Sequence, residues 1–206
     1  MAAASTIRRW EKVMFKKVLA AAAAALFLSA TAYQPAQASW FGGARTLGDP
    51  EISRIEPKNT VRAPLAYQIF CLRNSAECRK SKGATSVPYS AALAAKIERV
   101  NLSVNRSMKW KQDERDVWKV GGAAGDCEDF ALTKRSRLIR MGVPAGALRM
   151  AVVKTRKGEG HAVLVVRTTR GDLVLDNTKD EVLTREQTNY RWIGLASADP
   201  LKWERL

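Results

Sequence analysis

The chain has one histidine and only three cysteines among its 206 residues. This scarcity excludes the usual zinc hydrolases, because the sequence does not supply the several histidine or cysteine ligands that such a metal needs. It also fixes the identity of any imidazole base, which must be His161. A lone histidine is more often structural or exposed than catalytic, so its neighbours have to decide its role. We expect no organic cofactor.

A long hydrophobic run is also missing. The basic start of the chain is followed by an apolar stretch of about 15 residues, from Val18 to about Ala32, whereas a helix that spans a bilayer needs ~20. Ala36 and Ala38 then place small residues where signal peptidase requires them. We therefore predict a signal peptide over residues 1–38 and a periplasmic or secreted mature protein. An uncleaved membrane anchor is the alternative.

The remaining chain has no internal repeat and no long low-complexity segment. Its roughly 168 residues suffice for one domain with one core. We predict a loose N-terminal arm over residues 39–62 and a single domain over residues 63–206. The formal charge of +15 falls to about +11 without the first 38 residues. No nucleic-acid motif accompanies this charge and the basic residues are scattered, which favours an ordinary solvated surface.

The three cysteines differ in their surroundings. Cys71 and Cys78 are separated by six residues, and an oxidising compartment favours a disulfide between two such neighbours. Cys127 is then left over, and an unpaired thiol in an exported protein calls for an explanation, of which chemical reactivity is one. A buried, inert cysteine is the alternative.

The apolar spacing predicts helices in the first half of the domain and strands in the second. Leu93, Ile97, Val100 and Val104 recur at helical spacing within residues 88–106, and a second helix is expected over residues 126–140. Later segments are dense in valine and leucine, as buried strands are: residues 148–154, 161–168, 173–176 and 190–195. Helices followed by an antiparallel sheet make an α+β fold.

Cys127 lies at the start of the second predicted helix, within residues 125–130 (Gly-Asp-Cys-Glu-Asp-Phe). The unpaired backbone N–H groups and the dipole at a helix N-terminus favour a thiolate. The same N–H groups can hold the oxyanion of a tetrahedral intermediate. Cys127 is therefore the candidate nucleophile.

His161 and Asp176 are the candidates for the base and for the carboxylate that orients it. His161 begins a predicted strand and Asp176 ends the next one. Folding the chain back at Gly171 brings both to the same end of an antiparallel pair, although their different distances from the turn require a bulge or an uneven loop. Alternatively, Asp176 and Asn177 simply form a turn. The joint order of a helix-start cysteine, a strand-start histidine and a strand-end aspartate is hard to obtain by accident.

Four segments together carry a resemblance: residues 125–130, 142–144 (Gly-Val-Pro), 158–164 (Gly-Glu-Gly-His-Ala-Val-Leu) and 173–177 (Leu-Val-Leu-Asp-Asn). They resemble the bacterial transglutaminase-like cysteine peptidases, in particular compact alphaproteobacterial-type members, over about residues 65–200. The resemblance implies a papain- and transglutaminase-like α+β core, with helices and a helix-start nucleophile packed on an antiparallel sheet. It gives Cys127, His161 and Asp176 the triad roles.

The best-known branch of this family consists of periplasmic proteases that clip surface adhesins and require calcium. By that resemblance, Asp126 and Glu128 are expected to bind calcium, with Asp129 and Asp116 as additional ligands. Carboxylates around a thiol would raise its pKa, and a divalent cation with oxygen ligands would reverse this effect. Alternatively, acidic residues in the first turn only stabilise the helix.

The sequence departs from that branch just before the nucleophile. The branch has a longer segment with a Trp-x-Thr-Pro pattern there, whereas here Asp116-Val117-Trp118 is followed only by residues 119–124 before the Gly-Asp-Cys motif. Because of this departure, the substrate and part of the calcium site of that branch do not carry over to this sequence. The triad residues are unaffected. Trp118 is expected to pack in the core, or alternatively to line the cleft or direct its indole N–H toward an oxyanion.

We therefore expect an exported thiol hydrolase, a cysteine peptidase or amidase, that acts on a protein substrate in the periplasm or outer membrane. Acyl transfer of the transglutaminase type shares the same acyl-enzyme and is a related reaction. A non-catalytic envelope module that keeps the fold for binding is the alternative from another class. Neither a nucleic-acid partner nor a stable membrane anchor is expected.

Overall fold

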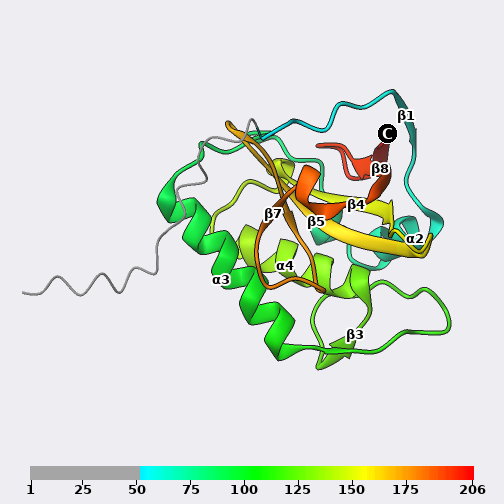
Figure 1. Cartoon of the computed structure of the whole chain (residues 1–206). Coiled ribbons are helices and arrows are strands. Elements are labelled where there is room, and N and C mark those ends of the chain that lie inside the picture. Colours follow the sequence, from blue (N-terminus) through cyan, green and yellow to red (C-terminus); the bar gives the residue numbers. More distant parts are fainter. Residues whose placement is uncertain (1–51) are drawn as a thin grey trace, which may run out of the picture. The chain divides into compact units, whose positions relative to one another are not determined.

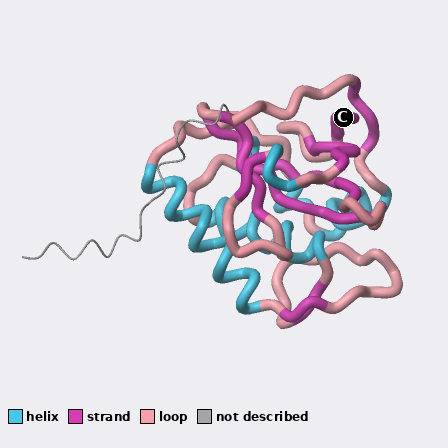
Figure 2. The backbone as a smooth tube through the Cα atoms, viewed as in Figure 1, coloured by secondary structure: helices cyan, strands magenta, loops and turns pink. Residues whose placement is uncertain are grey.

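The computed structural model describes residues 52–206 of the chain (Figures 1 and 2). The helices of this part are α2 (Leu65–Arg73), α3 (Ala91–Ser107) and α4 (Cys127–Arg140). One sheet contains β1 (Asn59–Arg62), β4 (Leu148–Lys154), β5 (Gly160–Thr168), β6 (Gly171–Leu175), β7 (Leu183–Thr184), β8 (Arg191–Ala196) and β9 (Lys202–Arg205). Two short strands, β2 (Lys109–Trp110) and β3 (Ala124–Gly125), form a separate parallel pair. The predicted signal peptide and residues 39–51 of the predicted arm lie outside the described residues.

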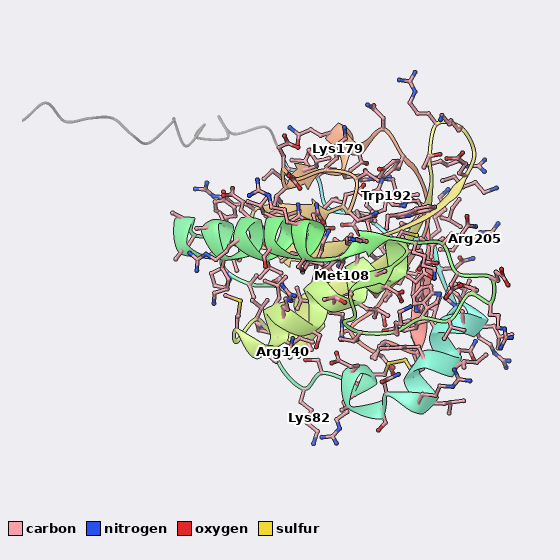
Figure 3. All side chains as sticks on the ribbon, turned by 90° about the horizontal axis from the view of Figure 1, so that it is seen from below. Lys82, Met108, Arg140, Lys179, Trp192 and Arg205 are labelled. Carbon is pink, nitrogen blue, oxygen red and sulfur yellow. A yellow bond between two sulfur atoms is a disulfide. The ribbon has the colours of Figure 1, made fainter. Side chains whose placement is uncertain are left out.

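Helices α3 and α4 lie side by side and run in opposite directions (Figure 3). They confirm the helices predicted over residues 88–106 and 126–140. Helix α3 starts later than predicted because Ser90 caps it, its Oγ accepting a hydrogen bond from the backbone N–H of Leu93. Its buried residues include Ile97, Val100 and Val104, at the helical spacing seen in the sequence. No helix of the described part has the length and apolar character needed to cross a membrane.

The seven-stranded sheet has the order β1-β9-β8-β4-β5-β6-β7, and all its neighbouring strands are antiparallel. This confirms the α+β class, and β4, β5, β6 and β8 are the four predicted strands. Side chains of β5 alternate between two cores. Leu164 and Val166 belong to the core that the helices cover, whereas Val163 and Val165 belong to a second core on the other face. The centre of the sheet is therefore buried on both faces.

The segment before α2 is more firmly built into the domain than the loose arm that we predicted over residues 39–62. Within its described part, β1 pairs with β9, and Ile55 is fully buried in the second core. The backbone N–H of Ile55 also donates to Asp172 Oδ2 over 2.9 Å. The side chains of β1 are all exposed, so the strand has no apolar alternation that would have revealed it in the sequence. Strand β1 is held by hydrogen bonds to β9, which lies far from it in the sequence.

Helix α2 is anchored by a disulfide and by aromatic packing. Cys71 and Cys78 form the predicted disulfide, with their Cα atoms 5.4 Å apart. Tyr67 packs edge-on against Trp118 and Trp203, with ring centroids 5.4 and 5.5 Å apart. The helix thereby joins the loop that precedes α4 to the last strand of the sheet.

Candidate active site

Cys127 is the first residue of α4, and its thiol lies beside the start of β5. Asp126 precedes it as the N-cap residue in an extended conformation. The backbone N–H of Ala162, the residue after His161, lowers the pKa of the Cys127 thiol. Since α4 packs along β5, the structure brings the predicted nucleophile next to the segment that carries the predicted base.

The surroundings of Cys127 favour the neutral thiol. Burial and the carboxylate of Glu128 raise the pKa of Cys127 to about 12, against the lowering effect of the Ala162 N–H. The thiol donates a hydrogen bond to Glu128 Oε2 over 3.2 Å. A thiol in this state is a poor nucleophile, because the thiolate is the reactive form. Burial and Glu128 thus outweigh the helix-start effect that the sequence suggested.

His161 and Asp176 form a buried pair. The distance between His161 Nε2 and Asp176 Oδ1 is 3.0 Å, and the two side chains are 8% and 0% exposed. The register of β5 and β6 is regular, from Leu164 opposite Leu175 to the turn. Neither the bulge nor the uneven loop that we expected is present, since the regular pairing continues to Thr168 opposite Gly171. Asp176 directly follows β6, and the imidazole spans the remaining diagonal offset.

Asp176 is held as a carboxylate by several donors. Thr178 donates to Oδ1 through its backbone N–H (2.8 Å) and its Oγ1 (3.0 Å), and Tyr190 donates its hydroxyl to Oδ2 (2.6 Å). Burial raises the pKa of Asp176, but the hydrogen bonds, first of all that of His161, outweigh it and hold the pKa well below the usual range. Because an ionised Asp176 accepts from Nε2, the Nδ1 atom of His161 is left as the acceptor.

Tyr190 and Thr178 were not identified from the sequence. Tyr190 also packs edge-on against His161, with ring centroids 5.5 Å apart. Tyr190 reaches Asp176 because the chain folds back toward the sheet after β7. No local pattern in the sequence predicts this course of the chain. Thr178 belongs to the turn that Asp176 and Asn177 indicate. The sequence therefore predicted the turn, but not the hydrogen bonds that Thr178 donates to Asp176.

Asp126 and Glu128 are the two predicted calcium ligands that the structure brings together. Burial and the hydrogen bond with Asp126 raise the pKa of Glu128 to about 8, so the two carboxyl groups are in contact. Asp126 Oδ1 is buried and has no hydrogen-bond partner among the described residues. Contacting carboxyl groups with an unsatisfied oxygen fit a divalent cation that prefers oxygen ligands. No three histidine, cysteine or acidic side chains converge as a metal site within the part of the chain that the structure describes.

The other two predicted ligands have different contacts. Asp129 Oδ1 accepts from the backbone N–H of Lys119 over 2.9 Å, and Lys119 Nζ lies 3.1 Å from Oδ2. Asp116 Oδ1 accepts from the indole N–H of Trp118 over 2.8 Å. Both carboxylates therefore shape the loop before α4. Trp118 is 8% exposed and packs on Tyr67, which is the core role that we expected, and its N–H is occupied by Asp116.

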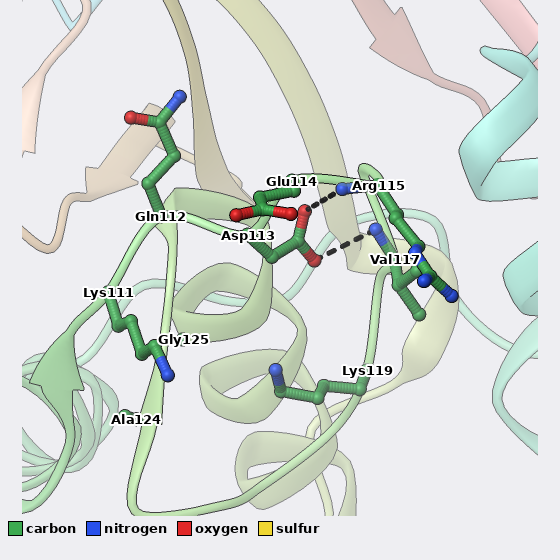
Figure 4. Close-up of a pocket in the computed structure, with 9 residues that line it drawn as sticks. All are labelled: Lys111, Gln112, Asp113, Glu114, Arg115, Val117, Lys119, Ala124 and Gly125. Carbon is green, nitrogen blue, oxygen red and sulfur yellow. Dashed lines mark hydrogen bonds between the residues drawn. The ribbon is translucent and has the colours of Figure 1, made fainter.

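A pocket of about 420 Å³ lies within the same loop, beside Gly125 (Figure 4). The residues that line it are Lys111, Gln112, Asp113, Glu114, Arg115, Val117, Lys119, Ala124 and Gly125. Figure 4 shows the ammonium ends of Lys111 and Lys119 pointing toward each other across this space. Asp113 fixes the far side of the loop by accepting from the backbone N–H groups of Arg115 and Val117 over 3.2 and 2.9 Å. The pocket thus opens two residues before the candidate nucleophile.

Comparisons with known proteins place the chain in a family. The sequence model of the family described as bacterial transglutaminase-like cysteine proteinase (BTLCP) matches residues 57–206. No curated protein matches the chain significantly.

Among solved structures, calcium-bound LapG of Legionella pneumophila is 26% identical over 50% of this chain, with a TM-score of 0.47. The chain covers 64% of the length of that protein. A second LapG structure is 21% identical and has a TM-score of 0.46, covering 66% of this chain and 76% of LapG. EGTA-treated LapG is 20% identical with a TM-score of 0.44, over 65% and 74% of the two chains.

Proposed function

The chain belongs to the family of bacterial transglutaminase-like cysteine proteinases, and on this premise we propose that it is an exported thiol hydrolase with a Cys127–His161–Asp176 triad. The observation that carries the proposal is the buried hydrogen bond between His161 Nε2 and Asp176 Oδ1. This bond leaves Nδ1 free as a base, on the strand whose start lies beside the thiol of Cys127.

The proposed reaction uses these groups in turn. His161 Nδ1 takes the proton of Cys127, and the sulfur attacks an amide carbonyl to form a thioester. Asp176 orients the ring and stabilises its charged form. The imidazolium returns the proton to the leaving amine, and water then hydrolyses the thioester. The unpaired N–H groups at the start of α4 hold the oxyanion during both steps.

Calcium is part of the proposal because burial and Glu128 hold Cys127 as a neutral thiol when no cation is bound. Asp126 and Glu128 would hold the ion through their carboxylates. When bound, calcium supplies positive charge that offsets the carboxylates beside the sulfur. Asp129 and Asp116 keep the neighbouring loop in place through Lys119 and Trp118.

We propose that the substrate is a protein of the periplasm or outer membrane. The predicted signal peptide over residues 1–38 supports export. The disulfide between Cys71 and Cys78 supports it independently, because such bonds persist in oxidising compartments. The pocket beside Gly125 is proposed to take a substrate side chain next to the scissile bond.

The test compares the purified wild-type protein with the Cys127→Ala and His161→Ala variants. Each is added, with millimolar calcium, to envelope proteins from cells that make only the Cys127→Ala variant. New fragments with the wild-type protein, and none with either variant, would support a Cys–His hydrolase. Fragments formed equally by Cys127→Ala would refute it. Thermal unfolding of each variant shows that a loss of activity is not a loss of fold.

Two further readouts distinguish the alternatives. Incorporation of a labelled amine into envelope proteins in place of cleavage would show acyl transfer, which uses the same acyl-enzyme. Cys127 is the one free thiol of the described residues, so its alkylation by iodoacetamide can be followed by mass. A thiol that stays inert at neutral pH with calcium present, together with no fragments, would indicate a binding module.

A further inference from the structure

Lys134, in the middle of α4, is a buried charged residue that the proposed reaction does not use. Its side chain is 0% exposed, and its Nζ atom has no hydrogen-bond partner among the described residues. Burial of an ammonium group without compensation is unfavourable, so a buried lysine is normally paired with opposite charge. The compensation must come from charges that face Lys134 across the interior.

The position of Lys134 on its helix points to that compensation. Lys134 follows Cys127 by seven residues, which is about two turns, so both lie on one face of α4, roughly 10 Å apart along its axis. Helix α4 packs along β5, and the carboxylates of Asp176 and Asp180 favour the charged form of Lys134. One face of α4 therefore carries the candidate nucleophile and, two turns later, a buried ammonium group that the charge of Asp176 favours.

The loop that carries these two carboxylates is also tied to α3. Asn105 Nδ2 donates to the backbone carbonyls of Asp176 and Lys179 over 3.0 and 2.9 Å. Asn101 Nδ2 donates to the backbone carbonyls of Lys179 and Asp180, both over 2.9 Å. Figure 3 shows Lys179 next to α3. Residues 176–180 are thus tied to α3 through the amides of Asn101 and Asn105.

We propose that Lys134 is a positioning residue whose ammonium balances the buried carboxylate of Asp176 and, together with Asn101 and Asn105, fixes the loop of residues 176–180. A fixed loop keeps Asp176 against His161 and so keeps the imidazole in the orientation that the thiol needs. Burial lowers the pKa of Lys134 to about 7, while Asp176 and Asp180 act in the opposite direction. This inference rests on the proposed function, since it assigns a role within the same triad.

The experiment uses the Lys134→Met variant, which removes the charge and keeps the length of the side chain. Leu138→Ala is the matched control, because Leu138 is a fully buried residue of the same helix whose truncation destabilises the fold without removing a charge. With calcium present, the rate of Cys127 alkylation is expected to fall about tenfold in Lys134→Met, a common size for groups coupled in one network. In Leu138→Ala it is expected to stay within about twofold of wild type.

The single histidine permits a direct spectroscopic readout. The His161 Nε2–H proton, donated to a carboxylate, is expected as an isolated downfield proton resonance in the wild-type protein, and it cannot be confused with another histidine. The inference predicts that this resonance is lost or broadened in Lys134→Met and retained in Leu138→Ala. A merely structural role for Lys134 would affect both variants in proportion to their loss of stability.

A double-mutant cycle shows whether Lys134 acts through Asp176. In an Asp176→Asn background, Lys134→Met should change the alkylation rate by less than about twofold. An equal tenfold fall in that background would overturn the inference, as would a wild-type rate and an unchanged resonance in Lys134→Met. If Lys134→Met does not fold, Asn105→Ala replaces it, because Asn105 is only half-buried and holds the same loop. Retained reactivity and an unchanged resonance in Asn105→Ala would then overturn the inference.

The outcome for the triad itself is read separately. A wild-type Cys127 that does not react, with or without calcium, would count against the proposed function. A reactive wild-type thiol that is insensitive to Lys134 would leave the triad intact and refute only the positioning role.

Discussion

Replacement of Glu128 by glutamine is expected to stabilise the calcium-free protein at neutral pH. Glu128 is buried, contacts the carboxyl group of Asp126 and accepts a hydrogen bond from the Cys127 thiol. Its pKa is raised to about 8 in the folded protein from the ordinary 4.5. The folded state disfavours the ionised form of Glu128. The contribution of protonated Glu128 to the free energy of unfolding is therefore lost as the pH rises from about 4.5 to about 8.

The magnitude follows from this pKa. Each pH unit between 4.5 and 7 costs ~1.4 kcal/mol of folding free energy, which gives an upper limit of about 3.4 kcal/mol at pH 7. Relaxation of the surrounding structure and penetration of water around an ionised Glu128 reduce this limit, and about half of it is expected to remain. Glutamine also makes a weaker hydrogen bond with the Cys127 thiol, a loss of about 0.5 kcal/mol. The net gain for Glu128→Gln is therefore about 1 kcal/mol, or a rise in Tm of about 3 °C for a domain of this size.

The assay is thermal unfolding in chelator at pH 7 and at pH 5, with Glu98→Gln as the control. Glu98 is an exposed residue of α3, so its variant should stay within about 0.5 kcal/mol of wild type. The advantage of Glu128→Gln should shrink at pH 5, where wild-type Glu128 holds its proton in both states. Millimolar calcium should reverse the order of stability, because the variant lacks one carboxylate ligand. A variant that is less stable than wild type at pH 7 in chelator would refute the reasoning.

Two other predictions concern structural features that support the site, the disulfide and the packing at the start of α4. Replacing both Cys71 and Cys78 by serine should lower the free energy of unfolding by about 2 kcal/mol, and reductant should lower the Tm of the wild-type protein but not of the double variant. Gly125→Ala should disturb the start of α4, because a Cβ at this position would overlap the Asp129 carboxylate. It is expected to slow Cys127 alkylation more than Gly83→Ala, whose added Cβ would make only an ordinary 3.6 Å contact with the Ser81 side chain. Equal rates for the two glycine variants would contradict the packing argument.

The parts of the fold that the sequence predicted are those with a local pattern. Helix α3 and strands β4, β5, β6 and β8 carry apolar residues at the spacing of their secondary structure, and all were expected close to their observed bounds. Strands β1 and β9 were not expected, since their pairing depends on contacts between distant segments. Helix α4 was expected, but its burial was not. Its polar residues Lys134 and Arg135 are 0% and 3% exposed, although their residue types suggest a solvated face.

In the candidate site, too, the sequence predicted what has a local pattern and not what depends on contacts between distant segments. Cys127, His161 and Asp176 could be selected because each lies at the end of a predictable element. Their chemical properties depend on groups from elsewhere in the chain. Tyr190 donates its hydroxyl to Asp176, and the backbone N–H of Ala162 lowers the pKa of the Cys127 thiol. No pattern within a few residues encodes such contacts, because they depend on how separate elements pack.

The pairing of β1 with β9 has a consequence for the order in which the protein is made. Residues 59–62 find their partner only when residues 202–205 are available, and β4 lacks one of its two neighbours until β8 is complete. Contacts of such long sequence separation form late, because the closure of a long loop must come first. A chain emerging from the ribosome would therefore carry all three residues of the proposed triad before its sheet can close. The reactivity proposed for Cys127 should accordingly be absent from nascent chains that still lack β9 and begin only after that strand is released.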